Sequence, residues 1–314
     1  QDADSISLLN AATGTETSQF KSGSAHARTR LAFTADGNWL ASSDQAEFVR
    51  IHNLRTGQEE FRFQPHDWII DLAFTRDERL LTLGNSGKKQ GRQAVLSIWD
   101  IPTRHKIGTL LGVPPAAREF SFHQPSGTVL LAGSSIKRWQ VTTGTELNVL
   151  RSTVPDPQGL VFADEQRLIG PYRSSFLALI DFTSNTTIPV PGNAYGRVTR
   201  HPGSGELVMA SMFDRGGSGK VAKFSAGTNL QTVLQTDSAS GLLDIRHSQT
   251  GEQVVAVFRH NEPRILSHDT LHPITTLSAP DVAVRQAAFV DQDRHVVGIA
   301  RSRQTESQGD RLIR

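Results

Sequence analysis

The hydrophobic and polar positions of the chain follow one pattern that recurs seven times. Each copy has an aliphatic residue, a bulky residue three positions later, an Asp-like or Asn-like residue next, and then Thr and Gly or similar residues. An apolar strand that ends in a tight turn has this form. The seven copies are Ile6–Gly14, Val49–Gly57, Leu96–Arg104, Ile136–Gly144, Leu177–Asn185, Val221–Asn229 and Ile265–Pro273.

The spacing of these copies predicts the fold. A period in the low forties matches the length of one four-stranded blade of a β-propeller. The bulky positions lie 43, 47, 40, 41, 44 and 44 residues apart, and they are held in turn by Leu9, His52, Trp99, Trp139, Ile180, Phe224 and His268.

A second series of apolar residues alternates with the first. Each member closes a short strand before a turn, and a further apolar run follows, so that each pair is typical of a β-hairpin. The closing residues are Phe33, Phe74, Phe122, Phe162, Val198, Ile245 and Phe289. Together the two series predict an all-β, seven-bladed β-propeller of four-stranded antiparallel blades, with residues 1–314 as a single domain.

The two ends of the chain predict how the ring closes. Ile6–Leu9 and Thr15–Phe20 supply a third and a fourth strand, whereas Arg285–Ala300 supplies a first and a second. Pairing them completes the seventh blade and removes open sheet edges, which invite aggregation. Asp310–Arg314 has the form of a further third strand and competes with Ile6–Leu9. We favour the N-terminal strand, because it is joined to its own fourth strand.

Because the repeat register continues to Arg314, either the chain is a piece of a longer protein or its end interrupts a strand. We expect a piece of a longer protein. The sequence leaves open whether a further blade follows.

The repeats resemble those of the WD40-repeat family, most closely in the stretch Phe33–Asn53 and in the dipeptide Trp99-Asp100. The resemblance covers essentially the whole chain. In that family a His, a Ser or Thr, an Asp and the Trp form a hydrogen-bonded chain within a blade. Here His26 and Pro65-His66 are the remnants of the family's Gly-His pair, and Asp44 is the one clear candidate for its Asp. We therefore expect unequal blades held mainly by apolar packing, with residues 160–190 the poorest.

Composition narrows the function classes. The 33 basic and 31 acidic residues give a net charge of +2, which is too little for a protein that grips a polyanion along its surface. The lack of cysteine excludes disulfides, thiolate zinc sites and cysteine nucleophiles. The sequence has neither an apolar stretch of about 18 residues nor a signal segment, so we expect no membrane span and a cytoplasmic location.

The residues that bear chemistry are sparse. A propeller channel can hold a metal ion between carboxylates and histidines of several blades, but the inner strands supply only Asp71 and Asp244, with Glu119 one step away. There is no G-x-S-x-G motif, and the glycine-rich residues 215–220 lack the spacing of a phosphate loop. We predict no catalytic residue, no metal site and no cofactor.

We expect the histidines to have structural roles. His52 and His268 occupy the family's Trp position, where we expect half-buried rings with local hydrogen bonds. His123, His201 and His247 fall in first hairpin turns on one face, and we expect them to be solvated. A ligand or pH-switch role is the alternative for His52 and His268.

Long connections between second and third strands provide the candidate binding surface. They are Gly84–Gln93, Phe213–Lys220 and Arg301–Arg311, with the shorter Pro171–Ser175 nearby, and in this fold they open on one face. Their basic residues would form one edge of that face, here called the basic rim, with Trp68 and Tyr172 as aromatic anchors. The basic rim comprises Lys88, Lys89, Arg92, Arg173, Arg215, Lys220, Arg301 and Arg303.

The resemblance implies a protein-interaction platform, since family members mostly lack catalysis and assemble partners on their faces. We expect a monomeric, non-catalytic scaffold or sensor domain whose protein partner is acidic, with nucleic acid an improbable ligand. A place beside kinase or NTPase signalling modules follows only by analogy with similar bacterial propellers. The alternatives are a propeller hydrolase or lactonase with a metal in the channel, and a weak polyanion binder.

Overall fold

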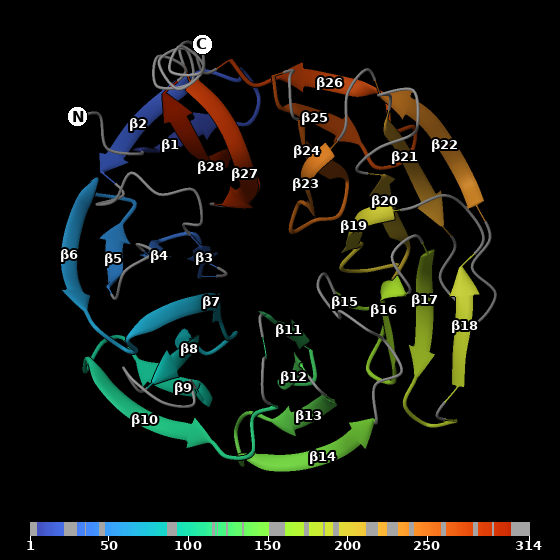
Figure 1. The fold of residues 1–314 in the computed structure, drawn as a ribbon. Coiled ribbons are helices and arrows are strands. Elements are labelled where there is room, and N and C mark those ends of the chain that lie inside the picture. The colour runs from blue at the N-terminus through green and yellow to red at the C-terminus, as the bar shows by residue number, and fades with distance from the viewer. Residues whose placement is uncertain are drawn as a thin grey trace, which may run out of the picture. The chain divides into compact units, whose positions relative to one another are not determined.

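The described residues form a seven-bladed β-propeller, with 28 strands in seven four-stranded antiparallel sheets. This architecture comes from a computed structural model, and Figure 1 shows the strands of each sheet. The described residues contain no helix, and therefore none that could cross a membrane. The structure describes residues 5–21, 30–34, 36–43, 48–86, 93–114, 117, 119–123, 125–133, 135–150, 161–172, 176–184, 186–190, 195–211, 219–224, 232–238, 242–258, 262–278, 282–290 and 292–302.

The strands fall into two compact units, of which the second comprises Ala27–Val198 and carries four sheets in sequence order. Its strands are β3 (Leu31–Phe33), β4 (Trp39–Ser43), β5 (Val49–Asn53), β6 (Gln58–Phe63), β7 (Trp68–Phe74), β8 (Arg79–Ser86), β9 (Gln93–Asp100), β10 (His105–Leu110), β11 (Glu119–His123), β12 (Thr128–Ala132), β13 (Ile136–Gln140), β14 (Thr145–Leu150), β15 (Val161–Phe162), β16 (Arg167–Tyr172), β17 (Phe176–Asp181) and β18 (Thr186–Val190).

The first unit comprises Gln1–His26 and Thr199–Arg314. Its strands are β19 (Tyr195–Arg200, which spans the boundary), β20 (Leu207–Ser211), β21 (Gly219–Phe224), β22 (Thr232–Ser238), β23 (Leu242–His247), β24 (Gln253–Phe258), β25 (Arg264–Ser267), β26 (Pro273–Thr276), β27 (Val282–Val290), β28 (His295–Ser302), β1 (Ser5–Asn10) and β2 (Glu16–Lys21).

The two ends of the chain share one sheet, as predicted. Its strand order is β2-β1-β28-β27, and β1 pairs with β28 through Ile6 opposite Ile299 and Leu8 opposite Val297. The N-terminal strand therefore takes the third position of this sheet. The competing segment Asp310–Arg314 lies outside the described residues.

The repeated bulky position is buried in six of the seven sheets, and Trp99 in the remaining sheet is half-buried. Trp139 and Phe224 are each 1% exposed, which is typical of side chains that hold neighbouring sheets together. His52 and His268 are 2% and 4% exposed, so both are buried more deeply than the half-buried rings that we expected.

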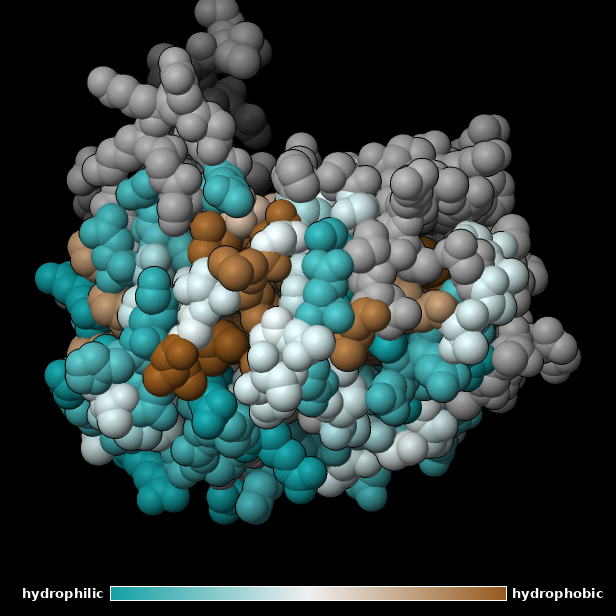
Figure 2. Space-filling view, turned by 90° about the horizontal axis from the view of Figure 1, so that it is seen from below, coloured by the Kyte–Doolittle hydropathy of each residue, from teal (hydrophilic) through white to brown (hydrophobic). Residues whose placement is uncertain are grey.

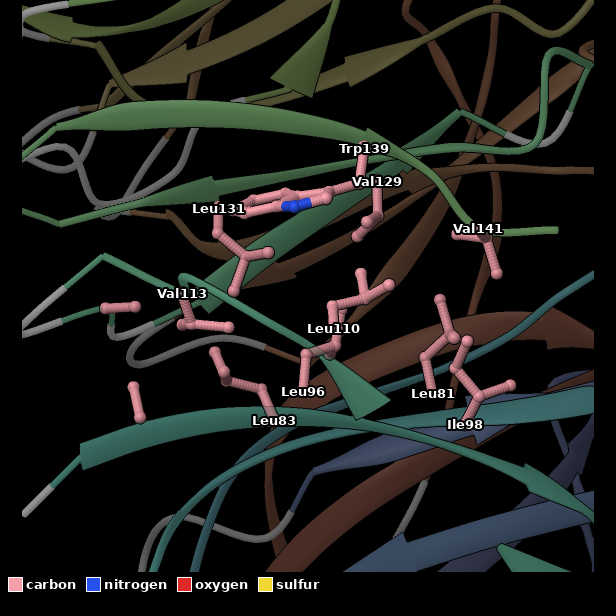
Figure 3. Packing of buried hydrophobic residues seen from close by; sticks show 12 residues of the cluster. Leu81, Leu83, Leu96, Ile98, Leu110, Val113, Val129, Leu131, Trp139 and Val141 are labelled. Atoms are coloured by element: carbon pink, nitrogen blue, oxygen red, sulfur yellow. The ribbon is translucent and has the colours of Figure 1, made fainter. Parts of the chain in front are cut away.

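A representative core cluster lies between the sheets β7 to β10 and β11 to β14. Leu83 and Leu96 face Leu131 and Trp139 across the interface, as Figure 3 shows. Burial of each such side chain contributes roughly 1.5–3 kcal/mol to the free energy of unfolding. The apolar period in the sequence thus becomes the packing between sheets.

The blade expected to be poorest in recognisable features contains the shortest strand. β15 has two residues, Val161 and Phe162, which pair with Ile169 and Leu168 of β16. A short innermost strand leaves fewer ladder hydrogen bonds in this sheet.

A few large apolar side chains stay exposed on the outer strands of the second unit. Ile107 in β10 and Leu147 in β14 are 49% and 42% exposed, and Leu111, just after β10, is 81% exposed. β10 and β14 lie at the lower edge of Figure 1, and Figure 2, seen from that side, shows hydrophobic side chains gathered among hydrophilic ones.

Candidate functional site

Most of the basic rim lies outside the described residues. This holds for Lys88, Lys89, Arg92, Arg173, Arg215 and Arg303. For Tyr172 in β16, Lys220 in β21 and Arg301 in β28 the structure describes the strand backbone only. The gathering of these side chains on one face therefore stays a prediction.

Trp68 is the predicted site residue whose side chain is described. It begins β7, pairs with Asn85 near the end of β8, and is 38% exposed. The connection that follows Ser86 carries Lys88, Lys89 and Arg92. An exposed indole thus lies at the base of a basic connection.

The acids predicted along the inner strands have local partners. Asp71 accepts hydrogen bonds from the backbone N–H of Leu72 (3.0 Å) and of Phe120 (3.3 Å). Asp244 is 5% exposed, and its Oδ1 lies 3.5 Å from Nε of Arg246. Glu119 is described in its backbone only. The described part of the chain contains no group of three or more His, Cys, Asp or Glu residues that could hold a metal ion.

Thr82 joins His66 to Trp99 within one sheet. Nε2 of His66 lies 2.9 Å from Oγ1 of Thr82, and the Trp99 indole N–H donates to the same Oγ1 at 2.9 Å. Nε2 also lies 3.0 Å from the Thr82 carbonyl oxygen, which only accepts, so we place the His66 proton on Nε2. Burial lowers the pKa of His66 and keeps the ring neutral. Asp44, the candidate for a fourth member in the β3 to β6 sheet, lies outside the described residues.

The sheet β3 to β6 repeats part of this arrangement with a histidine in place of the Trp. Nε2 of His52 lies 3.0 Å from Oγ of Ser42, and Ser42 occupies the position in β4 that Thr82 occupies in β8. Burial lowers the pKa of His52. Its contacts are those of a structural residue of the core.

Three histidines of the first unit lie together. The sequence interpretation had His201 and His247 near one another in turns of one face, but it did not foresee His268 beside them. The ring centroids of His201, His247 and His268 are separated by 4.6 to 5.6 Å. His268 lies between the other groups: its Nδ1 is 3.1 Å from Nε2 of His247, and its Nε2 is 3.0 Å from Oε2 of Glu206. Thr199 completes the chain, with Oγ1 at 3.2 Å from Nδ1 of His247.

The hydrogen-bond partners determine the tautomers of this histidine cluster. The Glu206 carboxylate accepts, so Nε2 of His268 carries a proton and its Nδ1 accepts from Nε2–H of His247. Oγ1 of Thr199 accepts from the His247 backbone N–H at 3.0 Å and donates to Nδ1 of His247. In this arrangement the His247 ring carries one proton, on Nε2, and is neutral.

The electrostatics of the cluster favour the neutral form of His247 and the ionised form of Glu206. Burial, followed by the charges of His268 and His201, lowers the pKa of His247 to about 3. Burial is also the main cause that lowers the pKa of His201, whose Nδ1 accepts from the backbone N–H of Gly203 and Ser204. The hydrogen bond from His268 lowers the pKa of Glu206.

The expectation of solvated turn histidines is therefore wrong for His247 and for His123. His123 is 9% exposed and bonds through Nδ1 to Oγ of Ser126 at 2.8 Å. The one available signal was that the turns carrying His201 and His247 lie 46 residues apart, which is close to one repeat.

A cavity of about 170 Å³ lies between the first two sheets of the second unit. The half-buried Trp39 and Phe61 and the buried Phe74 supply aromatic walls. Glu60, Glu78 and Arg104 add exposed charged side chains. The Arg104 guanidinium lies over the Phe61 ring, 4.5 Å from its centroid. Sequence reasoning missed this site, because its residues belong to four separate segments.

Two residues of the cavity adopt left-handed backbone conformations. Glu78 has a φ of 60° and Arg104 a φ of 61°, whereas Gly37 and Gly57 hold the matching turn positions of the preceding sheet. A non-glycine residue there costs on the order of 1 kcal/mol. The turns of the β7 to β10 sheet therefore carry Glu78 and Arg104 at positions where glycine would cause no backbone strain.

Comparison with known proteins adds no family assignment. No protein-family model matches this chain, and no curated protein matches it.

Proposed function

We propose that this chain is a WD40-like, non-catalytic protein-interaction scaffold whose partner binds the loop-bearing face through the basic rim. The propeller fold is consistent with this role, because it holds many connections on a rigid frame where binding residues concentrate. The Trp99–Thr82–His66 hydrogen bonds support the WD40-like part of the proposal.

The exposed Trp68 is the observation that carries the proposal. Tryptophan is among the residues that contribute most to interfaces, because a large ring is desolvated while its conformational entropy is low. Trp68 remains 38% exposed at the base of the connection that carries Lys88, Lys89 and Arg92. An acidic partner would be steered by these charges and anchored by the ring.

The test is affinity capture from source-cell lysate, followed by cross-linking mass spectrometry. The wild-type chain should capture a discrete protein, cross-linked near the β8–β9 connection. The reversal of Lys88, Lys89, Arg215 and Arg303 to Glu should abolish that capture, and Trp68→Ala should weaken it at least tenfold, the loss of about 1.4 kcal/mol.

The matched control carries the same change of charge at four exposed positions away from the basic rim. These positions are Arg55, Arg76, Lys106 and Arg294, each changed to Glu. This control should retain capture. Equal loss in both variants would assign the effect to overall charge, and full capture by the rim reversal would overturn the proposed surface.

A further inference from the structure

We propose that the cavity bounded by Trp39, Phe61, Glu60 and Glu78 binds one alkylammonium group, the side chain of a lysine in a partner polypeptide. This site is separate from the basic rim and does not rest on it. The cavity lies at the C-terminal ends of β7 and β9, which are Phe74 and Asp100. Trp68 and the β8–β9 connection lie at the N-terminal ends of the same two strands. Seven extended residues, the length of β7, span roughly 20 Å.

The aromatic walls suit a cation. An ammonium group is attracted to the negative face of an aromatic ring, most strongly to tryptophan. The cavity already shows this chemistry, because the Arg104 guanidinium lies 4.5 Å from the Phe61 centroid. Trp39 and Phe61 both pack on the adjoining core and are only partly buried, so their rings are fixed and still reachable.

The charges select a cation over an anion. Glu60 and Glu78 contribute two carboxylates against the single guanidinium of Arg104, which is engaged with Phe61. Glu60 accepts one hydrogen bond, from Nδ2 of Asn53 at 3.2 Å, and the rest of its carboxylate can still accept. A primary ammonium has three donors and would match these acceptors.

The size limits the ligand to a single side chain. Sites for drug-sized molecules and cofactors occupy about 300–1,000 Å³, whereas this cavity measures about 170 Å³. The tetramethylene stem of lysine is apolar and would lie against Trp39 and Phe74 while its ammonium group meets the carboxylates. A nucleotide or a sugar phosphate is too large and has the wrong charge.

Backbone strain in two turns also marks this cavity, at Glu78 and Arg104. Of the positive-φ residues in the described chain, Glu78 and Arg104 both line this cavity, at turn positions where neighbouring turns have glycine. Strained backbone concentrates at binding sites, where the position of the side chain matters more than the cost. Arg104 competes with an incoming lysine for the Phe61 face, so its removal should favour the ligand.

The experiment is an NMR titration of the indole N–H of Trp39, with that of the buried Trp139 as internal reference. The probe is lysine with an acetylated N-terminus and an amidated C-terminus, and the neutral control is norleucine blocked in the same way. We expect saturable shifts of the Trp39 signal with a Kd on the order of 1 mM. Norleucine should bind about fivefold more weakly.

Variants of the cavity test which side chains recognise the ammonium group. The double variant Glu60→Gln and Glu78→Gln should weaken lysine binding about fivefold, because two exposed carboxylates lose their charge. Its matched control, Glu252→Gln with Glu262→Gln, changes two exposed carboxylates of the other unit and should leave binding unchanged. Arg104→Gly should tighten binding and also relax the turn.

Three results would overturn the proposal: no shift of Trp39 with blocked lysine, equal binding of lysine and norleucine, or loss of lysine binding in Arg104→Gly. The failure of this site would leave the basic rim proposal intact, since the partner capture described above is measured with variants outside the cavity.

Discussion

Thr82 shows how one hydroxyl group organises a blade. It is fully buried, and its Oγ1 lies 2.9 Å from both Nε2 of His66 and Nε1 of Trp99. A buried donor without a partner costs more than the net gain from its hydrogen bond. Thr82 Oγ1 therefore supplies the acceptor for the Trp99 indole N–H and lies, with the Thr82 carbonyl oxygen, within hydrogen-bond distance of His66.

Thr82→Val should lower the free energy of unfolding by about 2–3 kcal/mol, because the isosteric side chain leaves the Trp99 donor without an acceptor and weakens the site of His66. Urea denaturation followed by tryptophan fluorescence measures the change. Ser42→Ala serves as the comparison, since it removes one contact, that with His52, and should cost roughly half as much. Equal losses would contradict the double role of Thr82.

His247 illustrates a residue whose environment determines its charge. Its pKa is lowered to about 3, whereas an unfolded histidine titrates near its ordinary value of 6.5. Between these values the unfolded chain binds the proton more readily, so stability falls as the pH falls. The ionisable groups that act on His247 are His268, His201 and Glu206, and Lys223 lies 4.0 Å from Glu206.

His247→Gln should therefore reduce the loss of stability on acidification. Between pH 7 and pH 5 the wild-type chain should lose roughly 1–2 kcal/mol more than the variant, because only the wild type has this suppressed protonation. Chemical denaturation at both pH values provides the measurement. The exposed His105 gives the control: His105→Gln should follow the wild type. If His247→Gln lost as much free energy of unfolding between pH 7 and pH 5 as the wild type, a buried neutral His247 would be refuted.

At the scale of elements, the third strands were the most predictable part of the fold. All seven overlap the predicted repeats, because an apolar period followed by a turn sequence is a local signal. The bulges near the bulky positions were not predicted. In the sheet of Trp139, for example, the register with β14 shifts between Arg138 and Trp139. A bulge depends on how two strands pair, which a single strand's sequence does not record.

At the scale of the whole molecule, the two ends of the chain complete one sheet by pairing with each other. β1 and β28 are separated by most of the chain, and they share six paired residues in one sheet. The prediction of this pairing rested on counting strands at both ends and on the penalty for leaving sheet edges open.

Deleting residues 1–20 should expose the edge of β28, raise aggregation and lower the Tm, because the sheet loses β1 and most of β2. Size-exclusion chromatography with light scattering and a thermal melt report both effects. Deleting only residues 1–4, which precede β1, should change neither. A monomeric 1–20 deletion with an unchanged Tm would exclude this role of the N-terminal strands.

Of the candidate sites, one follows from the sequence and two are visible only in the structure. The basic rim follows from loop length and composition, which are sequence properties, and it stays a prediction. The histidine cluster and the aromatic cavity are contacts between turns of different blades: Trp39 and Arg104, for instance, are 65 residues apart. Sequence reasoning assigned His201 and His247 to comparable turns, but it could not determine that a third ring and Glu206 would reach them.

The sequence by itself determined the number of blades, their antiparallel strands and the partner of the N-terminal strand, because each of these follows from the spacing of apolar positions along the chain. Only the tertiary structure decided which polar side chains meet. Their contacts depend on the register, twist and packing of sheets that are distant in sequence. Hence His268 bridges His247 and Glu206, and two glutamates and an arginine surround Trp39 and Phe61.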